Sequence, residues 1–215
     1  MVPLTIIDVR DAAEAGVTTA VAALRRGDLA VVPTDTVYGL AADAFSPPAV
    51  TRLLAAKGRG RDMPVPVLVG AWRGIDGLAE HVSGAMRALV ESFWPGPLTL
   101  VVRAAPSLAW DLGETRGTVA VRMPLHPVTL AVLAETGPLA VSSANRSGRP
   151  PATTAAQAQE QLGSAVAVYL DGGSSGEPVP STIVDLTGPH PRVRRAGALP
   201  AEDLRALLPD LEVAP

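Results

Sequence analysis

The sequence predicts a single α/β domain, residues 1–215, built on a twisted mixed β-sheet flanked by helices. The chain has 215 residues, 47% of them hydrophobic, which is enough for one large core. Short apolar runs alternate with apolar residues at helical spacing, a pattern typical of α/β folds. The connections after Leu170 and Leu186 are too short for a helical crossover, so we expect antiparallel strand pairs there.

The first expected helix covers residues 11–26. Val17, Val21 and Leu24 recur there at helical spacing, which gives the helix one apolar face. Gly27 follows at the position where glycine commonly ends a helix. The helix is therefore expected to pack its apolar face on the sheet.

The first buried strand is expected at residues 29–32, a short apolar run. The polar residues 34–36 follow it, and open α/β sheets bind ligands at such carboxyl ends of strands. The next helix begins at Ser46, whose hydroxyl we expect to cap it ahead of two prolines, and it continues to Gly58. Lys57 therefore lies at a helix C-terminus.

Strands and helices continue to alternate along the rest of the chain. Further strands are expected at residues 64–69, 97–102, 118–122, 139–142, 166–170, 182–186 and 192–195. Further helices are expected at residues 83–94, 127–135, 154–162 and 201–208. The total is seven or eight strands in one sheet, and the last helix closes the domain.

The composition excludes several classes of site. The chain has no cysteine, which rules out disulfides, cysteine nucleophiles and thiolate metal ligands. It contains no phosphate loop, dinucleotide fingerprint or zinc-protease signature. A net charge of −3 and scattered aromatic residues argue against nucleic acid as the main ligand. No signal peptide and no membrane-spanning run is found, so we expect a cytoplasmic protein.

Lys57 is the single lysine of a chain that otherwise uses arginine. It begins the run Lys57-Gly58-Arg59-Gly60-Arg61, in which glycines alternate with arginines. A lysine ammonium on its flexible stem can follow an anion, or lose its proton when it is buried. This run is the first candidate for anion chemistry, with chance placement of the last lysine as the alternative.

Polar clusters stand at the expected ends of several strands. They share hydroxyls, amides, glycines and cations: residues 34–36, 57–61, 122, 142–145, 171–176, 181–182 and 194–195. Hydroxyls and backbone N–H groups donate to phosphate or carboxylate oxygens, and cations neutralise them. Each cluster alone is typical of an ordinary turn, but together they predict an anion-binding site.

The same segments resemble the YrdC/TsaC family, the L-threonylcarbamoyladenylate synthases of tRNA modification. The motifs that carry the resemblance are Val32-Pro-Thr-Asp-Thr-Val-Tyr-Gly-Leu40, Lys57-x-Arg59 with Pro64, Phe93-Trp-Pro-Gly-Pro-Leu-Thr99, Val119-Ala-Val-Arg-Met-Pro124 with His126-Pro127, Ser143-Ala-Asn-x-Ser-Gly148, Ser181-Thr-Ile-Val-Asp185 and Arg195-x-Gly197. They follow one another from about residue 32 to residue 197. The resemblance implies the YrdC-like fold, similar to that of dihydroxybutanone-phosphate synthase, in the short form without an extra C-terminal domain.

The resemblance also implies a reaction. Such an enzyme condenses L-threonine, bicarbonate or CO2, and ATP into threonylcarbamoyl-AMP and pyrophosphate, with Mg²⁺ on the nucleotide. It is a nucleotidyltransferase whose product serves the formation of N6-threonylcarbamoyladenosine in tRNA. We expect the product to pass to a tRNA threonylcarbamoyl transferase complex, and any binding of tRNA itself to be weak.

By the same resemblance, Lys57, Arg59, Ser143 and Asn145 form the catalytic tetrad. We expect the two cations to hold triphosphate and carbamate oxygens, and the two polar side chains to donate hydrogen bonds to the same anions. The four residues therefore count as both catalytic and ATP-binding.

Five further residues match binding positions of the family. Thr36, Arg122 and Ser181 match positions around L-threonine, where a guanidinium suits the α-carboxylate. Thr118 and Arg195 match positions around the nucleotide. These assignments follow from the resemblance and from no other signal.

Some residues and functions keep an alternative reading. Thr34 and Tyr38 fit structural roles equally well, and Arg61 fits a solvated loop charge. Two other functions stay open: an RNA-binding module of the same fold, and a carbamoyl-transfer domain like the one in hydrogenase-maturation proteins. Salt-sensitive binding of tRNA without turnover would favour the first of these.

The chain departs from the family pattern at several positions. Gly60, Val65 and Leu68 stand where the family commonly has Pro, Leu and His, which puts the flexibility of the loop and one contact to threonine in question. Pro180 replaces a common glutamate, so no metal ligand is assigned. The glycines at 58 and 60, and those of residues 172–176, are candidate hinges for a lid.

Overall fold

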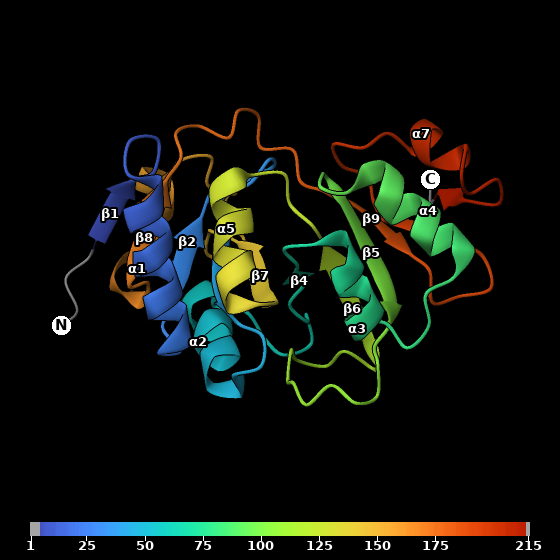
Figure 1. The fold of residues 1–215 in the computed structure, drawn as a ribbon, viewed down its shortest axis with the longest axis horizontal. Coiled ribbons are helices and arrows are strands. Elements are labelled where there is room, and N and C mark those ends of the chain that lie inside the picture. The colour runs from blue at the N-terminus through green and yellow to red at the C-terminus, as the bar shows by residue number, and fades with distance from the viewer. Residues whose placement is uncertain (1–4, 214–215) are drawn as a thin grey trace.

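The computed structural model describes residues 5–213 as one α/β domain (Figure 1). Within that range, eleven strands form one mixed sheet in the order β1-β8-β2-β3-β7-β4-β6-β5-β9-β10-β11. The strands are β1 (Thr5–Asp8), β2 (Ala30–Val32), β3 (Gly39–Asp43), β4 (Val67–Leu68), β5 (Leu98–Arg103), β6 (Thr118–Arg122), β7 (Leu139–Ser143), β8 (Val168–Asp171), β9 (Thr182–Asp185), β10 (Arg192–Arg195) and β11 (Glu212–Val213). The predicted fold class is confirmed. The first four residues, which belong to the stretch searched for a signal peptide, lie outside the described residues.

The number of strands was predicted too low. The sequence indicated seven or eight, and the three strands that it missed are β1, β3 and β11. Residues 39–43 of β3 read Gly-Leu-Ala-Ala-Asp and contain no β-branched residue, so local propensity does not mark them as a strand. Antiparallel pairing with β2 on one side and β7 on the other holds them extended.

The two short connections have different outcomes. After Leu186 the chain turns back, and β9 and β10 pair antiparallel as expected. The expectation after Leu170 is wrong, because β8 and β9 stand seven places apart in the sheet. Residues 172–181 cross that distance without forming a helix or a strand (Figure 1).

Helices cover both ends of the sheet (Figure 1). They are α1 (Ala13–Arg25), α2 (Pro47–Lys57), α3 (Ile75–Leu78), α4 (Gly84–Phe93), α5 (Pro127–Thr136), α6 (Ala155–Leu162) and α7 (Ala201–Arg205). Helices α1 and α5 lie side by side and share one apolar core with strands β2, β7 and β8. Helices α2, α3, α4 and α6 belong to a second core, which holds the other face of the central strands. The last helix ends at Arg205, three residues before the expected end.

The expected cap of α2 is not formed. Ser46 occupies the N-cap position, but its side chain makes no capping hydrogen bond. The first two helical positions are Pro47 and Pro48, which have no N–H to offer. The next N–H, that of Ala49, already donates to the Ser46 carbonyl oxygen at 2.9 Å. No free donor is left within reach of the hydroxyl.

Candidate functional site

A cavity of about 400 Å³ lies over one face of the central strands. Leu100 pairs with Val121 across β5 and β6, so Thr99 and Arg122 lie on the same face of the sheet. The side chains on this face line the cavity, and those on the other face enter the core. The lining includes the predicted site residues Thr36, Arg59, Arg122, Ser143, Ser181 and Arg195. Six of the nine predicted residues therefore meet at one place.

Lys57 stands behind the wall of this cavity and does not line it. Gly58 ends α2 in the left-handed conformation, with φ of 61°, and Lys57 is 3% exposed. Its Nζ donates to the carbonyl oxygens of Ser143 at 2.5 Å and Asn145 at 2.7 Å. Its own carbonyl accepts from the Ser147 N–H at 2.8 Å. Lys57 thus joins the end of α2 to the loop that follows β7.

The environment of Lys57 changes its acidity. Burial, and secondarily the nearby charge of Arg59, lowers the pKa of the Lys57 ammonium from 10.5 to about 8. A pKa of about 8 lies above neutral pH, so the protonated form predominates there. The ammonium therefore donates to the two carbonyls in its charged form at neutral pH.

Arg59 faces the cavity with donors to spare. One terminal nitrogen lies 3.3 Å from the Ser142 hydroxyl oxygen, and the buried Nε has no hydrogen-bond partner. Burial lowers the pKa of Arg59 below its usual value. A buried N–H without a partner costs about 1–3 kcal/mol. An anion in the cavity would offset that cost.

Ser143 and Asn145, the other two residues of the predicted tetrad, also differ in whether their side chains face the cavity. Ser143 lines the cavity, and its hydroxyl oxygen lies 3.4 Å from Lys57 Nζ. The Asn145 side chain instead binds its own loop, because Nδ2 donates to the carbonyl oxygens of Arg146 at 2.9 Å and Arg149 at 2.7 Å. Arg59 and Ser143 are thus placed to touch a ligand, and Lys57 and Asn145 are placed to hold the loop around it.

Arg122 lies deep in the cavity and is 7% exposed. Three of its nitrogens are engaged: Nε donates to Gly96 O at 2.9 Å, one terminal nitrogen to Thr36 Oγ1 at 2.9 Å, and the other to Asp35 Oδ1 at 2.6 Å. Asp35 also accepts from the Leu125 N–H at 2.8 Å. A guanidinium has five N–H donors, so two remain for a ligand.

Sequence reasoning gave Asp35 no role. It belonged to the polar cluster at residues 34–36, but a carboxylate did not fit a site read as binding anions. The structure shows Asp35 as the counter-ion of the buried Arg122, with side chains 14% and 8% exposed. Buried charges are normally paired, which is the signal that could have found it.

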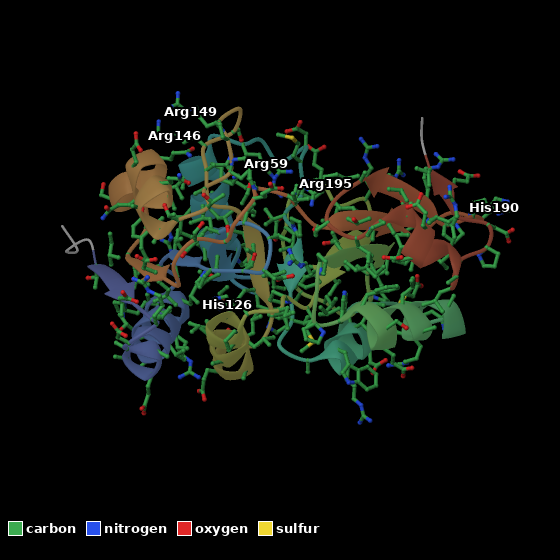
Figure 2. The ribbon with its side chains drawn as sticks, turned by 90° about the horizontal axis from the view of Figure 1, so that it is seen from above. Arg59, His126, Arg146, Arg149, His190 and Arg195 are labelled. Atoms are coloured by element: carbon green, nitrogen blue, oxygen red, sulfur yellow. The ribbon has the colours of Figure 1, made fainter. Side chains whose placement is uncertain are left out.

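Ser181 and Arg195 form the opposite wall. The Ser181 hydroxyl lies 2.8 Å from the Thr99 hydroxyl. Arg195 donates to the Ser181 carbonyl oxygen from Nε at 3.0 Å and from a terminal nitrogen at 2.8 Å. Arg195 belongs to β10 and Arg59 follows α2, so the two cations reach the cavity from different halves of the sheet (Figure 2). Neither forms an ion pair with a carboxylate among the described residues.

Thr118 is not brought to the cavity. It begins β6 on the same face as Ala120, which does line the cavity, but its hydroxyl donates to Thr115 O at 2.8 Å. Tyr38 has a structural role, since its side chain is fully buried and its hydroxyl donates to Gly173 O at 2.5 Å, although it also lines the cavity.

Among the described residues no group of three His, Cys, Asp or Glu side chains is placed to hold a metal ion.

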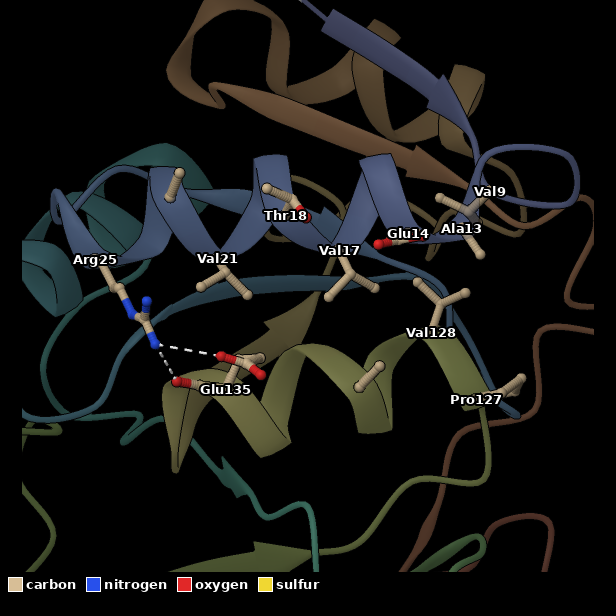
Figure 3. A pocket seen from close by; sticks show the side chains of 12 residues that line it. Val9, Ala13, Glu14, Val17, Thr18, Val21, Arg25, Pro127, Val128 and Glu135 are labelled. Atoms are coloured by element: carbon tan, nitrogen blue, oxygen red, sulfur yellow. Dashed lines mark hydrogen bonds and ion pairs between the residues drawn. The ribbon is translucent and has the colours of Figure 1, made fainter.

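A larger cavity, of about 780 Å³, lies elsewhere, between α1 and α5 (Figure 3). Its walls are mostly aliphatic, with Val17 and Val21 on one helix and Val128 on the other. Arg25 donates to the Glu135 carbonyl oxygen at 2.7 Å and pairs with its carboxylate at 3.5 Å. None of the nine predicted site residues lines this cavity, so the smaller one is the candidate site. The described helices include none that is both long and apolar enough to cross a membrane.

Solved structures define the class of protein to which this fold and cavity belong. The structure of Pyrococcus abyssi Sua5 complexed with L-threonine matches with a TM-score of 0.90 at 33% identity, over 100% of this chain and 63% of that one. E. coli YciO matches with a TM-score of 0.81 at 23% identity, over 95% of this chain and 100% of that one, which shows the fold alone. The class is that of the Sua5-like α/β proteins.

The family follows from the sequence comparison. The model of the Sua5/YciO/YrdC family, described as "Telomere recombination", matches residues 22–197. The chain belongs to this family. A Mycobacterium tuberculosis relative, provisionally named as a threonylcarbamoyl-AMP synthase, is 58% identical over 193 residues, or 90% of this chain and 89% of its own. The threonylcarbamoyl-AMP synthase of Pyrococcus abyssi is 35% identical over 212 residues, or 98% of this chain and 62% of its own. The chain therefore spans less than two thirds of the archaeal relative.

Proposed function

We propose that the protein is a threonylcarbamoyl-AMP synthase, which condenses L-threonine, bicarbonate or CO2, and ATP for the formation of N6-threonylcarbamoyladenosine in tRNA. The family and the names of the relatives support this function. The observation that carries it is that one cavity holds two adjoining groups of anion-binding donors, which meet where Arg195 donates to the Ser181 hydroxyl oxygen at 3.0 Å. A reaction that joins an amino acid to a nucleotide needs two such groups side by side.

The first group suits the amino acid. Arg122 has two N–H donors left for an α-carboxylate, and the hydroxyls of Thr36 and Ser181 lie on the same cavity. The complex of the archaeal relative with L-threonine supports the same substrate here. Discrimination against serine depends on one methyl group, which apolar contacts favour by about 1–3 kcal/mol.

The second group suits the phosphates. Arg59 brings a guanidinium with an unpaired buried Nε, Ser143 a hydroxyl, and Arg195 a second guanidinium from the opposite wall. Lys57 and Asn145 hold the loop that follows Ser143 at the end of β7, through the carbonyl bonds described above. Thr118 takes no part in this proposal. Mg²⁺ belongs to the substrate as Mg–ATP, since phosphate oxygens are ligands that it prefers.

The chemistry proceeds without an enzyme nucleophile. The threonine amine adds to the carbon of CO2 and loses a proton, which gives a carbamate. A carbamate oxygen then attacks the α-phosphorus of ATP, the bond from that phosphorus to the oxygen of the β-phosphate breaks, and pyrophosphate leaves. The protein contributes by holding the two reactants in line and by placing positive charge where negative charge develops. In this sense the enzyme is a nucleotidyltransferase.

The product is unstable in water as a mixed anhydride, so we propose that it passes to a transferase that acts on tRNA in the cytoplasm. Weak binding of tRNA to this protein fits the cations that surround the cavity, Arg59 and Arg195, which carry no carboxylate partner. The similarity to HypF, with a TM-score of 0.74 at 19% identity, shows the fold alone and gives no support to a carbamoyl-transfer function.

The direct test is to incubate the purified protein with Mg–ATP, bicarbonate and L-threonine. Pyrophosphate release should require threonine and bicarbonate together, and mass spectrometry should detect threonylcarbamoyl-AMP. Release that is independent of either substrate would rule out the synthase. Tight, salt-sensitive tRNA binding without turnover would instead identify an RNA-binding module.

A further inference from the structure

The loop between α2 and β4 carries Arg59 and is held from outside the cavity by the connection between β5 and β6. Residues 111–114 of that connection lie against residues 61–65 of the loop. The Val65 N–H donates to Leu112 O at 3.0 Å, and the Glu114 N–H donates to Arg61 O at 2.7 Å. We call residues 111–114 the clamp.

Gly113 allows the closest approach within the clamp. Its φ is +102°, and a Cβ at this position would lie 2.7 Å from the Arg61 carbonyl oxygen and 3.4 Å from Pro64 Cα. Such a distance to a backbone oxygen cannot be relieved by a side-chain rotation. Any larger residue must therefore push the clamp and the loop apart.

The loop is the side that would move. Leu112 is 1% exposed and belongs to the main core, so the clamp is anchored in the interior. Residues 60–63 of the loop are exposed. The loop also supplies Arg59 and Pro64 to the cavity wall. A displaced loop would carry the Arg59 guanidinium away from the position in which its donors face the cavity.

An ion pair adds to the same contact. Arg61 donates to Asp111 Oδ1 at 2.5 Å, and the Gly113 N–H lies 3.3 Å from the same oxygen. Next to Asp111, the Trp110 ring stacks on Phe45, with ring centroids 5.6 Å apart. Arg61, read from the sequence as a solvated charge, is thus part of the attachment of the loop.

We propose that Gly113 is a positioning residue for the triphosphate, because it lets the clamp fix the loop that presents Arg59. This inference rests on the proposed function, since it takes ATP as the ligand of Arg59. Arg122 and Ser181 lie on other elements, so the clamp should affect the nucleotide and leave threonine binding unchanged.

The test compares Gly113→Ala with Gly117→Ala. Gly117 lies in the same connection and has a positive φ of 75°, but a Cβ there would meet nothing within 4 Å. Both variants share the backbone strain, and only the first creates the close contact. We expect Gly113→Ala to raise the KM and the dissociation constant for ATP about tenfold, because a displacement near 1 Å can cost up to about 10²-fold. Gly117→Ala should change them less than about twofold.

A double-mutant cycle separates positioning from general damage. In an Arg59→Ala background, Gly113→Ala should cause little further loss of ATP affinity, because the group that it displaces is already gone. Equal losses in both backgrounds, or equal effects of the two glycine variants, would overturn the proposal. Wild-type protein that binds no ATP would instead contradict the proposed function.

A second pair of variants covers the case in which Gly113→Ala does not fold. Asp111→Asn removes the charge that pairs with Arg61, and Asp76→Asn removes a similarly exposed carboxylate that pairs with Arg87, also at 2.5 Å. We expect Asp111→Asn to raise the KM for ATP about threefold, in line with the modest strength of exposed pairs. No change in ATP affinity for Asp111→Asn relative to Asp76→Asn would contradict the clamp.

Discussion

Lys57 donates to two backbone carbonyl oxygens, and the phosphate contact that the family resemblance implies for it stays a prediction. A methionine in its place would keep the volume of the side chain but leave the Asn145 carbonyl without its donor, while the Ser143 carbonyl would keep only the Asn145 N–H, at 2.9 Å. We expect Lys57→Met to cost about 1–3 kcal/mol of stability and most of the activity. Lys57→Arg should also lose activity, because a planar fork does not fit where a compact ammonium does.

The lowered pKa of Lys57 predicts how its contribution to stability depends on pH. The unfolded chain holds this proton up to its ordinary pKa of 10.5, and the folded chain releases it at about 8. Burying the charge therefore weakens the fold below pH 8, and the penalty disappears as the pH rises from 8 to 10.5. Urea unfolding should show wild-type protein gaining up to about 3 kcal/mol relative to Lys57→Met over this range. A constant difference would argue against a depressed pKa.

Arg59 should matter for the reaction and little for the fold. Its side chain makes one hydrogen bond of 3.3 Å and leaves Nε unpaired. We expect Arg59→Ala to lower kcat/KM for ATP by about 10²-fold or more, with an unfolding free energy within about 0.5 kcal/mol of wild type. Arg73→Ala, at an exposed cation that does not line the cavity, is the control and should leave turnover unchanged. Normal turnover of Arg59→Ala would show that Arg59 is not part of the active site.

At the scale of single elements, two serines at helix starts provide a matched comparison. Ser83 caps α4, since its hydroxyl accepts from the Met86 N–H at 3.1 Å, whereas Ser46 at the start of α2 caps nothing. We expect Ser83→Ala to lower the free energy of unfolding by about 1 kcal/mol and Ser46→Ala to leave it nearly unchanged. Chemical denaturation measures both. Equal losses would show that the prolines of α2 do not exclude a cap.

The sequence predicts most elements correctly where local patterns are strong. The periodic apolar residues of α1 and the branched residues 98–103 of β5 are examples. It fails where neighbours decide the structure: the alanines of β3 become a strand because two other strands pair with them. The prediction of the site likewise succeeded where motifs are clear and failed where neighbouring residues decide the contacts. The motifs brought Arg59, Ser143 and Arg122 together, but no pattern indicates that Lys57 turns towards carbonyls or that Asp35 is the buried counter-ion.

At the scale of the whole molecule, residues 172–181 connect the two halves of the sheet and pass from β8 to Ser181 (Figure 1). Tyr38 holds the start of this segment. Its hydroxyl donates to Gly173 O and accepts from the Gly172 N–H at 3.0 Å. Because this segment leads directly to Ser181, which lines the cavity, we expect a loss of the contacts at its start to disturb the position of Ser181.

Tyr38→Phe tests this coupling. We expect a rise of about threefold or more in the KM for threonine, together with about 1–2 kcal/mol of lost stability from the unpaired Gly172 N–H. Tyr169→Phe is the control, since it removes a similarly buried hydroxyl that donates to Gly163 O at 2.7 Å, away from the cavity. If both variants raise the KM for threonine equally, the effect comes from general loosening of the core and not from the segment.

The burial of Lys57 also allows its reactivity to report local opening of the protein. Lys57 and the α-amino group are the two primary amines of the chain, and Lys57 is 3% exposed. An amine-reactive reagent can reach it only when the loop after β7 separates from the end of α2. The rate of acylation at Lys57, measured by mass spectrometry, therefore reports how often that separation occurs. Ligands that fill the cavity should slow this acylation, so the opening rate can be measured without an added label.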